Sequence, residues 1–307
     1  KNQVLDHIDF SLVPHKLTAV VGRNGSGKST LVSCVNQELP YTGEITFSDR
    51  NLAVMTLRER AQLISILPQT LHSPAVTVEE LTAFGRNPYL DFGKRMSPKD
   101  WQAVDDALEA IGISGLRDKL VTELSGGERQ KAYLAMVLAQ NTRVMILDEP
   151  TTYMDMEYEA AFFRLLETLK TKRKITFLVI MHNLSQAVRY ADRIVVLDGR
   201  RIRYQGDTRA CVASGVLESV FHVRQHQAED KGKGKTPCFG AALKPSFCKS
   251  FLFQPVEMKK AGTNSYGILK PARFSCRFFF CYVILNVTGY LSGFSNIMRG
   301  AVFCFPV

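Results

Sequence analysis

Short strands and helices are predicted along the first 225 residues by the hydrophobic pattern. Leu5, Ile8, Phe10 and Leu12 roughly alternate with polar residues and predict a half-buried strand, and GEITF (43–47) predicts another. Nearly continuous apolar runs predict buried strands at 17–22, 64–69, 144–148, 175–181 and 193–198. Asp198-Gly199 is a hairpin-turn sequence, so a further strand is expected over 201–206.

Helices are predicted between most of these strands. Thr77 and Glu80 have capping-box spacing ahead of an apolar stretch, and Ser97-Pro98 opens a helix that Gly112 closes. The apolar face expected for this helix comprises Trp101, Val104, Leu108 and Ile111. Another helix should follow Gly126-Gly127, with Tyr133, Met136 and Val137 on its apolar face. Further helical stretches are 29–39, 157–170 and 184–191.

Fully apolar strands that alternate with helices are typical of a parallel sheet covered on both faces. The predicted fold is therefore α/β, with a core of 1–70 and 143–225 and a helical subdomain inserted at about 71–142. Residues 226–307 are predicted to lie outside this domain.

Charge separates the two parts in the same way. The chain has a formal net charge of +10, but residues 1–225 contain 28 Lys+Arg and 26 Asp+Glu, whereas 226–307 contain 11 and 3. A nearly neutral main domain argues against nucleic-acid binding. Its two scattered cysteines, Cys34 and Cys211, suit a reducing compartment.

A glycine-rich segment joins the strand at 17–22 to the helix that follows. GRNGSGKST fits the phosphate-binding pattern G-x-x-x-x-G-K-S/T, in which backbone N–H groups and the helix N-terminus bind phosphates. Lys28 would neutralise the β- and γ-phosphates, and the Ser29 hydroxyl would bind Mg²⁺. The predicted nucleotide-binding residues are Gly22, Asn24, Gly25, Ser26, Gly27, Lys28, Ser29 and Thr30.

Two carboxylates follow a buried strand in VMILDEP (144–150). The carboxyl ends of strands are where open α/β sheets bind ligands. Asp148 suits a metal shell and Glu149 suits activation of water, although such a pair alone is as readily a helix cap.

LSGGERQ (124–130) then narrows the class of nucleotide hydrolase. It matches the signature sequence of ABC ATPases and stands before the VMILDEP strand, as in that family. From about residue 4 to 223 the chain resembles this family, which implies an ATPase that uses ATP and Mg²⁺.

The resemblance also assigns roles to isolated residues. Gln69 matches the Q-loop glutamine, which contacts the metal or the attacking water, and His182 matches the switch histidine that touches the γ-phosphate. Asp155 matches the D-loop aspartate, although TTYMD departs from the commoner S-x-L-D wording. In the family, Ser125, Gly126 and Gly127 would cap the ATP held by a second subunit in a head-to-tail dimer. The family's adenine-stacking aromatic residue is not present before Leu5, and we read its absence as truncation.

The segment TVEELTAFGRNPYL (77–90) resembles the ATPases of bacterial importers for iron–siderophore complexes, haem and cobalamin. The resemblance implies permease partners, with a periplasmic or lipid-anchored binding protein acting indirectly, at the cytoplasmic face of the inner membrane. Phe84 to Tyr89 are expected near the groove that receives the permease, or else simply end a helix. The alternatives are a soluble ABC ATPase of DNA repair or translation, and an exporter ATPase.

The last quarter of the chain differs in composition. It contains 11 of 19 Phe and five of seven Cys, and 278–298 is uncharged over 21 residues but interrupted by polar residues and glycines. We favour a reading-frame change or joined sequence, with an accessory domain or a membrane anchor as alternatives.

Overall fold

The computed structural model describes residues 3–91, 95–151, 154, 156–230 and 234–241. All of them lie in the first of two compact units, Lys1–Lys249, and the second unit, Ser250–Val307, lies outside the described residues. The uncharged stretch at 278–298 is also outside them. Among the described residues, no helix is long and apolar enough to cross a membrane.

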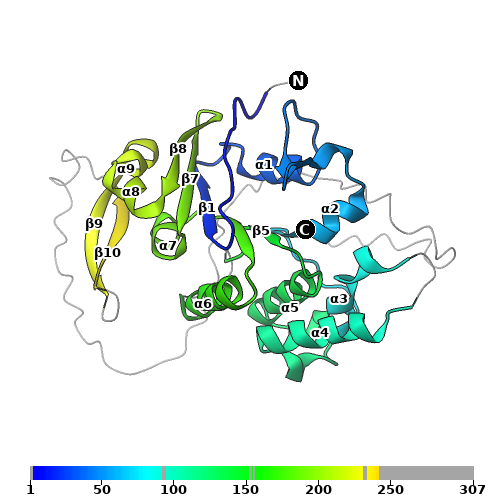
Figure 1. Cartoon of the computed structure of the whole chain (residues 1–307). Helices are drawn as coiled ribbons and strands as arrows, with labels where there is room; N and C mark the ends of the chain where they lie inside the picture. Colours follow the sequence, from blue (N-terminus) through cyan, green and yellow to red (C-terminus); the bar gives the residue numbers. More distant parts are fainter. Residues whose placement is uncertain (1–2, 92–94, 152–153, 155, 231–233, 242–307) are drawn as a thin grey trace, which may run out of the picture. The chain divides into compact units, whose positions relative to one another are not determined.

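A six-stranded sheet in the order β4-β5-β6-β1-β7-β8 forms the centre of the first unit (Figure 1). The neighbours from β4 to β7 are parallel, and β8 is antiparallel to β7. Its strands are β1 (Leu17–Gly22), β4 (Ile64–Leu67), β5 (Val144–Asp148), β6 (Thr176–Ile180), β7 (Arg193–Asp198) and β8 (Arg201–Asp207). The predicted hairpin turn joins β7 to β8, with positive φ at Gly199 and Arg200.

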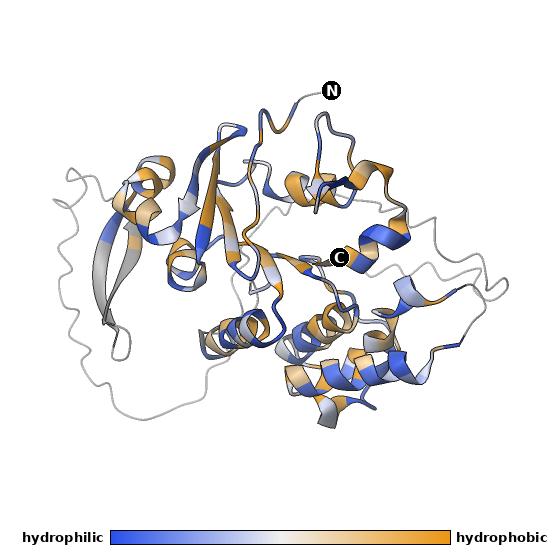
Figure 2. Ribbon diagram, viewed as in Figure 1, coloured by the Kyte–Doolittle hydropathy of each residue, from blue (hydrophilic) through white to orange (hydrophobic). Residues whose placement is uncertain are grey.

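Both faces of the sheet are largely buried along its five parallel strands, as the apolar runs predicted, whereas β8 alternates between exposed and half-buried residues. On β1, Leu17, Ala19 and Val21 belong to the larger core, whereas Val20 belongs to a smaller core on the other face. In Figure 2 much of the sheet is orange, whereas the outer strand β8 and the surrounding helices carry blue as well.

The helices are α1 (Lys28–Val35), α2 (Leu57–Leu63), α3 (Val78–Phe84), α4 (Pro98–Ile111), α5 (Gly126–Ala139), α6 (Met156–Lys172), α7 (Leu184–Tyr190), α8 (Thr208–Ala213) and α9 (Val216–Phe221). Within the described part of the chain, short 3₁₀ helices accompany them at η1 (Leu52–Val54), η2 (Asn87–Tyr89), η3 (Ser114–Leu116) and η4 (Val121–Glu123). The inserted helices α3, α4 and α5 pack together (Figure 1). The capping box predicted at Thr77 for α3 is present, and Ser97, which was predicted to open α4, also forms one.

Several details differ from the sequence prediction. Residues 5–12 form no strand, although Ile8, Phe10 and Leu12 do pack against the smaller core. The segment 43–47 contributes only β2 (Thr46–Phe47), which pairs with β3 (Arg50–Asn51). Trp101 is 41% exposed, because it lies in the first turn of α4, at the flank of the face formed by Val104, Ala107, Leu108 and Ile111.

A hairpin beyond α9 was not predicted. It comprises β9 (Val223–Asp230) and β10 (Gly234–Ala241), which are antiparallel. Phe239 packs against the larger core, and its backbone N–H donates to Ser185 Oγ at 3.3 Å. The hairpin therefore packs on α7 and extends the α/β unit past residue 225.

Candidate nucleotide-binding site

The glycine-rich loop connects the end of β1 to the start of α1. Gly25 and Gly27 have φ of 78° and 100°, a region that side chains other than glycine rarely adopt. At Gly22 a Cβ atom would lie 2.4 Å from Ser26 Oγ and 2.6 Å from Leu197 O, so only glycine fits. The loop therefore curves back under the N-terminus of α1, whose first N–H groups have no partners within the helix.

Lys28 is the first residue of α1, and its side chain turns back toward this loop. Its side chain is buried, and Nζ donates to the carbonyl oxygens of Gly22 at 2.8 Å and Arg23 at 3.3 Å. Burial lowers the pKa of the Lys28 ammonium, and the carboxylates of Glu149 and Asp148 oppose this shift. A cation held inside a loop of N–H groups is suited to bind a polyanion.

The two carboxylates lie at the end of β5, as predicted. Burial raises the pKa of Asp148 to about 6, and the nearby charge of Glu149 adds to this shift. Asp148 Oδ1 is buried and has no hydrogen-bond partner among the described residues. A buried carboxylate oxygen without a partner fits a site for a hard cation such as Mg²⁺.

Glu149 joins the ends of three strands. Gln69, which follows β4, donates from Nε2 to Glu149 Oε2 at 2.5 Å, and His182 Nε2, after β6, contacts Glu149 Oε1. Because β4, β5 and β6 are neighbours in the sheet, their carboxyl ends converge here. Glu149 itself has a φ of 51°, and its N–H donates to Ile180 O at 3.2 Å.

A pocket of about 390 Å³ lies beside these groups. It is lined by Val4, Asn24, Gly25, Gly27, Lys28, Ser29, Thr30, Glu149 and His182. Of the predicted loop residues, Gly22 and Ser26 are not part of this lining; Gly22 supplies the carbonyl that Lys28 binds, and Ser26 is buried.

Val4 and Leu5 were missed by the sequence prediction. Val4 lines the pocket, and a Cβ added at Gly27 would lie 2.4 Å from Leu5 Cδ2. The segment before β1 therefore packs directly on the phosphate-binding loop. The only signal in the sequence was an apolar pair, which did not distinguish a strand from this packing.

The LSGGERQ segment lies elsewhere. Ser125 is the N-cap of α5, and its Oγ forms the reciprocal capping box with Glu128. Ser125, Gly126 and Gly127 are not among the residues that line the pocket. A Cβ added at Gly126 would meet no atom within 4 Å, so this helix end has open space beside it.

The helix α5 also reaches the segment that follows Gln69. Tyr133 donates from its hydroxyl to His72 O at 3.0 Å, and Arg129 donates to Ser73 Oγ at 2.6 Å. These two contacts join the helix of the signature to the segment carrying the glutamine, and they were not predicted. Asp155 lies outside the described residues.

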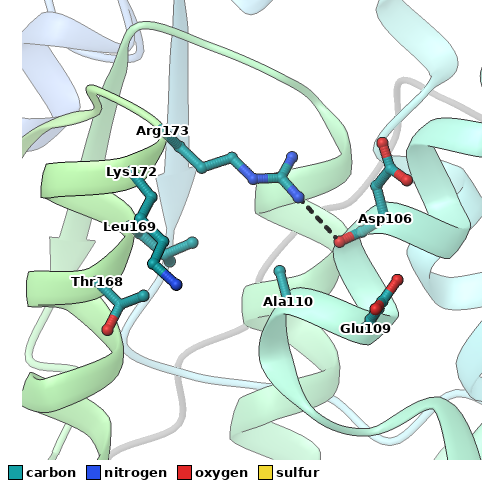
Figure 3. A pocket seen from close by; sticks show the side chains of 7 residues that line it. All are labelled: Asp106, Glu109, Ala110, Thr168, Leu169, Lys172 and Arg173. Atoms are coloured by element: carbon teal, nitrogen blue, oxygen red, sulfur yellow. Dashed lines mark hydrogen bonds between the residues drawn. The ribbon is translucent and has the colours of Figure 1, made fainter.

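A second hollow, of about 380 Å³, lies between α4 and α6 (Figure 3). Asp106 and Glu109 line it from α4, and Lys172 and Arg173 line it from the end of α6. Arg173 Nη2 donates to the Asp106 carbonyl at 3.2 Å. None of the predicted site residues lines this hollow.

The sequence of this chain is similar to those of known proteins. Residues 5–152 match the family described as ABC transporter. The petrobactin import ATP-binding protein FpuD of Bacillus anthracis is 35% identical over 78% of this chain and 86% of its own length. The chain belongs to the ABC transporter ATP-binding family. The ferric enterobactin transport ATP-binding protein FepC of Escherichia coli is likewise 35% identical, over 73% of this chain and 83% of its own length.

A solved structure supports the same assignment. An inward-facing ABC transporter described as of metal-chelate type superposes with a TM-score of 0.67 at 27% identity, covering 77% of this chain and 90% of that one. The predicted α/β fold of an ABC ATPase is confirmed, and the chain is an ATPase subunit of an ABC importer.

Proposed function

We propose that Glu149 activates the water that attacks the γ-phosphate of ATP held by residues 22–30. The observation that carries this proposal is the position of its carboxylate, between the Gln69 amide and the His182 imidazole at the rim of the pocket. A carboxylate held from both sides has a fixed direction, which a general base requires.

The phosphates would lie along the N-terminus of α1. Lys28 would exchange its bonds to the Gly22 and Arg23 carbonyls for phosphate oxygens, because a buried ammonium gains most from an ionised partner. Asp148, the Ser29 hydroxyl and the Gln69 side chain offer oxygen ligands for Mg²⁺, which would neutralise charge on the phosphates.

The signature residues are proposed to act on another chain. Ser125, Gly126 and Gly127 are separate from the lining of their own chain's pocket, which supports a head-to-tail dimer in which each helix α5 caps the partner's ATP. Asp155 would belong to the same interface. Each chain then carries two half-sites, and hydrolysis requires both chains.

The cargo is proposed to be an iron–siderophore complex, because the relatives are named for petrobactin and enterobactin. The ATPase would bind a membrane permease at the cytoplasmic face of the inner membrane. Recognition of the cargo would rest with the permease and its binding protein. Co-purification from the native cell would test this: a polytopic permease is expected, and recovery of ribosomal components would contradict it.

The catalytic proposal is tested with Glu149→Gln. This variant should bind Mg·ATP as the wild type does and should turn over about 10²–10⁴ times more slowly, the usual contribution of a general base. The matched control is Glu109→Gln, on the exposed side of α4. Near-normal turnover of Glu149→Gln would remove Glu149 from this role.

A further inference from the structure

The segment Phe84–Tyr89 was expected near the permease groove or at a helix end. Phe84 is 46% exposed, whereas the side chains of Arg86 and Tyr89 contact the C-terminal end of α5. Arg86 is only 6% exposed, and its Nε and Nη2 donate to Asp100 Oδ1 at 3.1 and 3.0 Å. A buried ion pair is costly unless its remaining hydrogen-bonding groups are also paired. The other hydrogen bonds of Arg86 and Asp100 therefore indicate which elements this ion pair holds together.

These contacts end on the last turn of α5. Arg86 Nη1 donates to the carbonyl of Ala139 at 2.8 Å, and the Tyr89 hydroxyl donates to the carbonyl of Gln140 at 2.9 Å. The guanidinium also lies 3.9 Å from the centroid of the Tyr89 ring. The final carbonyls of a helix have no partners within the helix and carry partial negative charge, so a cation and a hydroxyl bind them well.

Asp100 extends the same network to α4. Its Oδ2 accepts from Ser97 N and Ser97 Oγ, which forms the cap of α4. Hydrogen bonds from Ser97 and from Arg86 hold the pKa of Asp100 below its usual value. Gly85 allows the close approach, because a Cβ there would lie 2.1 Å from Met136 O on α5.

The helix α2, which directly precedes β4 of the sheet, contacts the same region. The carbonyl of Pro88 accepts from Arg58 Nε at 2.8 Å and from Gln62 Nε2 at 2.7 Å, both on α2. Gln140 Nε2 donates to Ala61 O at 2.5 Å. The carbonyl end of α5 is therefore fixed to α2, α3 and α4 together.

We infer that Arg86 and Tyr89 are positioning residues for the signature sequence. They fix the carbonyl end of α5, and a helix of 14 residues transmits that direction to Ser125 at its other end. Ser125 is thereby presented in the orientation needed to meet ATP on the second chain. This inference rests on the proposed action in trans.

Tyr89→Phe and Arg86→Lys test it in a Glu149→Gln background, where ATP-bound dimers should accumulate. Tyr89→Phe removes only the hydroxyl bond to Gln140. A neutral hydrogen bond corresponds to about fivefold in the equilibrium between the fixed and a displaced orientation of α5, and a dimer contains two such helices, so dimerisation should weaken by at most about 25-fold. Arg86→Lys loses the forked geometry and should weaken it more. The control is Tyr204→Phe, which loses a similar bond to Asp207 O at the end of β8.

Three measurements separate the possible results: binding of a fluorescent ATP analogue, ATP-dependent dimerisation by sedimentation, and thermal unfolding. Both variants should bind the analogue like the parent but dimerise more weakly. Equal dimerisation by Tyr89→Phe and the control, or parallel losses of nucleotide binding and dimerisation, would overturn the inference. If the parent itself fails to form an ATP-dependent dimer, action in trans fails, and the inference fails with it. Unfolded Arg86→Lys would leave Tyr89→Phe to decide.

Discussion

Replacing Asp148 with Asn should stabilise the nucleotide-free protein while it abolishes Mg²⁺-dependent turnover. Asp148 is half-buried, its buried Oδ1 atom has no partner among the described residues, and its pKa is raised from 3.8 to about 6. At pH 8 the folded protein must therefore hold an unfavourable charge. Asn removes this charge and also removes the anionic ligand that a metal requires.

The pKa shift sets the size of the gain. At about 1.36 kcal/mol for each pKa unit, the shift corresponds to an upper limit of roughly 3 kcal/mol at pH 8, and solvent screening of this half-buried carboxylate reduces that figure. The Asn amide has a burial cost of its own, so a gain of about 1–2 kcal/mol is expected, which is on the order of 5 °C in Tm for a domain of this size.

The pH dependence supplies the decisive measurement. Because the pKa of Asp148 is higher in the folded than in the unfolded protein, the folded state binds the proton more tightly between pH 4 and 6. Wild-type stability from this group is fully present below about pH 4 and is lost as pH rises through about 6. The advantage of Asp148→Asn should thus be large at pH 8 and absent near pH 4.

Thermal unfolding without nucleotide at the two pH values tests this, with the exposed Asp9→Asn as the control. Equal or lower stability of Asp148→Asn at pH 8 would refute the electrostatic reasoning, as would a gain that persists at pH 4. Addition of Mg·ATP should stabilise the wild type more than the variant, because binding to the folded state alone raises stability.

Three further predictions concern the loop, the dimer and the hairpin. Gly27→Ala should weaken ATP binding at least ~10-fold, because φ of 100° and the contact with Leu5 disfavour any Cβ at this position. The control Gly112→Ala, at φ 75° in open space, should lose only about 1 kcal/mol of stability. Equal ATP affinities of the two variants would contradict this prediction. Lys28→Ala and Ser125→Arg chains should each be inactive alone but regain ATPase activity when mixed, since one composite site then has neither defect; an inactive mixture of folded chains that form dimers would count against independent action in trans. A chain ending after residue 241 should retain the stability of the α/β unit, whereas one ending after 224 should lose about 2 kcal/mol with the Phe239 contact, and equal Tm values would show that the hairpin contributes nothing.

Elements were predictable where local signals agreed. The five parallel strands were apparent because both of their faces are largely buried, so their sequences are mainly apolar. The strand β8 alternates between exposed and half-buried residues and was predicted from the Asp198-Gly199 turn instead. Thr77 and Ser97 identified helix starts because a cap needs only a hydroxyl and an acid three residues later. The strand predicted at 5–12 is absent, because alternation of apolar and polar residues indicates burial of one side of a segment and does not indicate that it pairs with a neighbouring strand.

The site was predictable only in part. The glycine-rich loop is continuous in sequence, so its chemistry could be read directly. The contact of Gln69 and His182 with Glu149 depends on the order β4-β5-β6, which separate segments of the chain do not encode locally. The family resemblance supplied those residues. It did not supply the contacts of Arg86 and Tyr89 with α5, because one motif can either bind a partner or end a helix.

The geometry also bears on how two chains would share the work. Within one chain, Tyr133 and Arg129 connect α5 to residues 72 and 73, and Gln69 just before them holds Glu149. The helix that would cap the partner's ATP is thus linked to the base that would act on the chain's own ATP. We infer that movement of α5 as the dimer closes would shift Gln69 and, through it, Glu149, so the two ATP-binding sites of the dimer would be coupled. Such coupling predicts that Tyr133→Phe, which removes only the bond to His72 O, lowers the cooperativity of hydrolysis with ATP concentration while ATP still binds. Unchanged cooperativity in that variant would mean that each site responds to its own nucleotide alone.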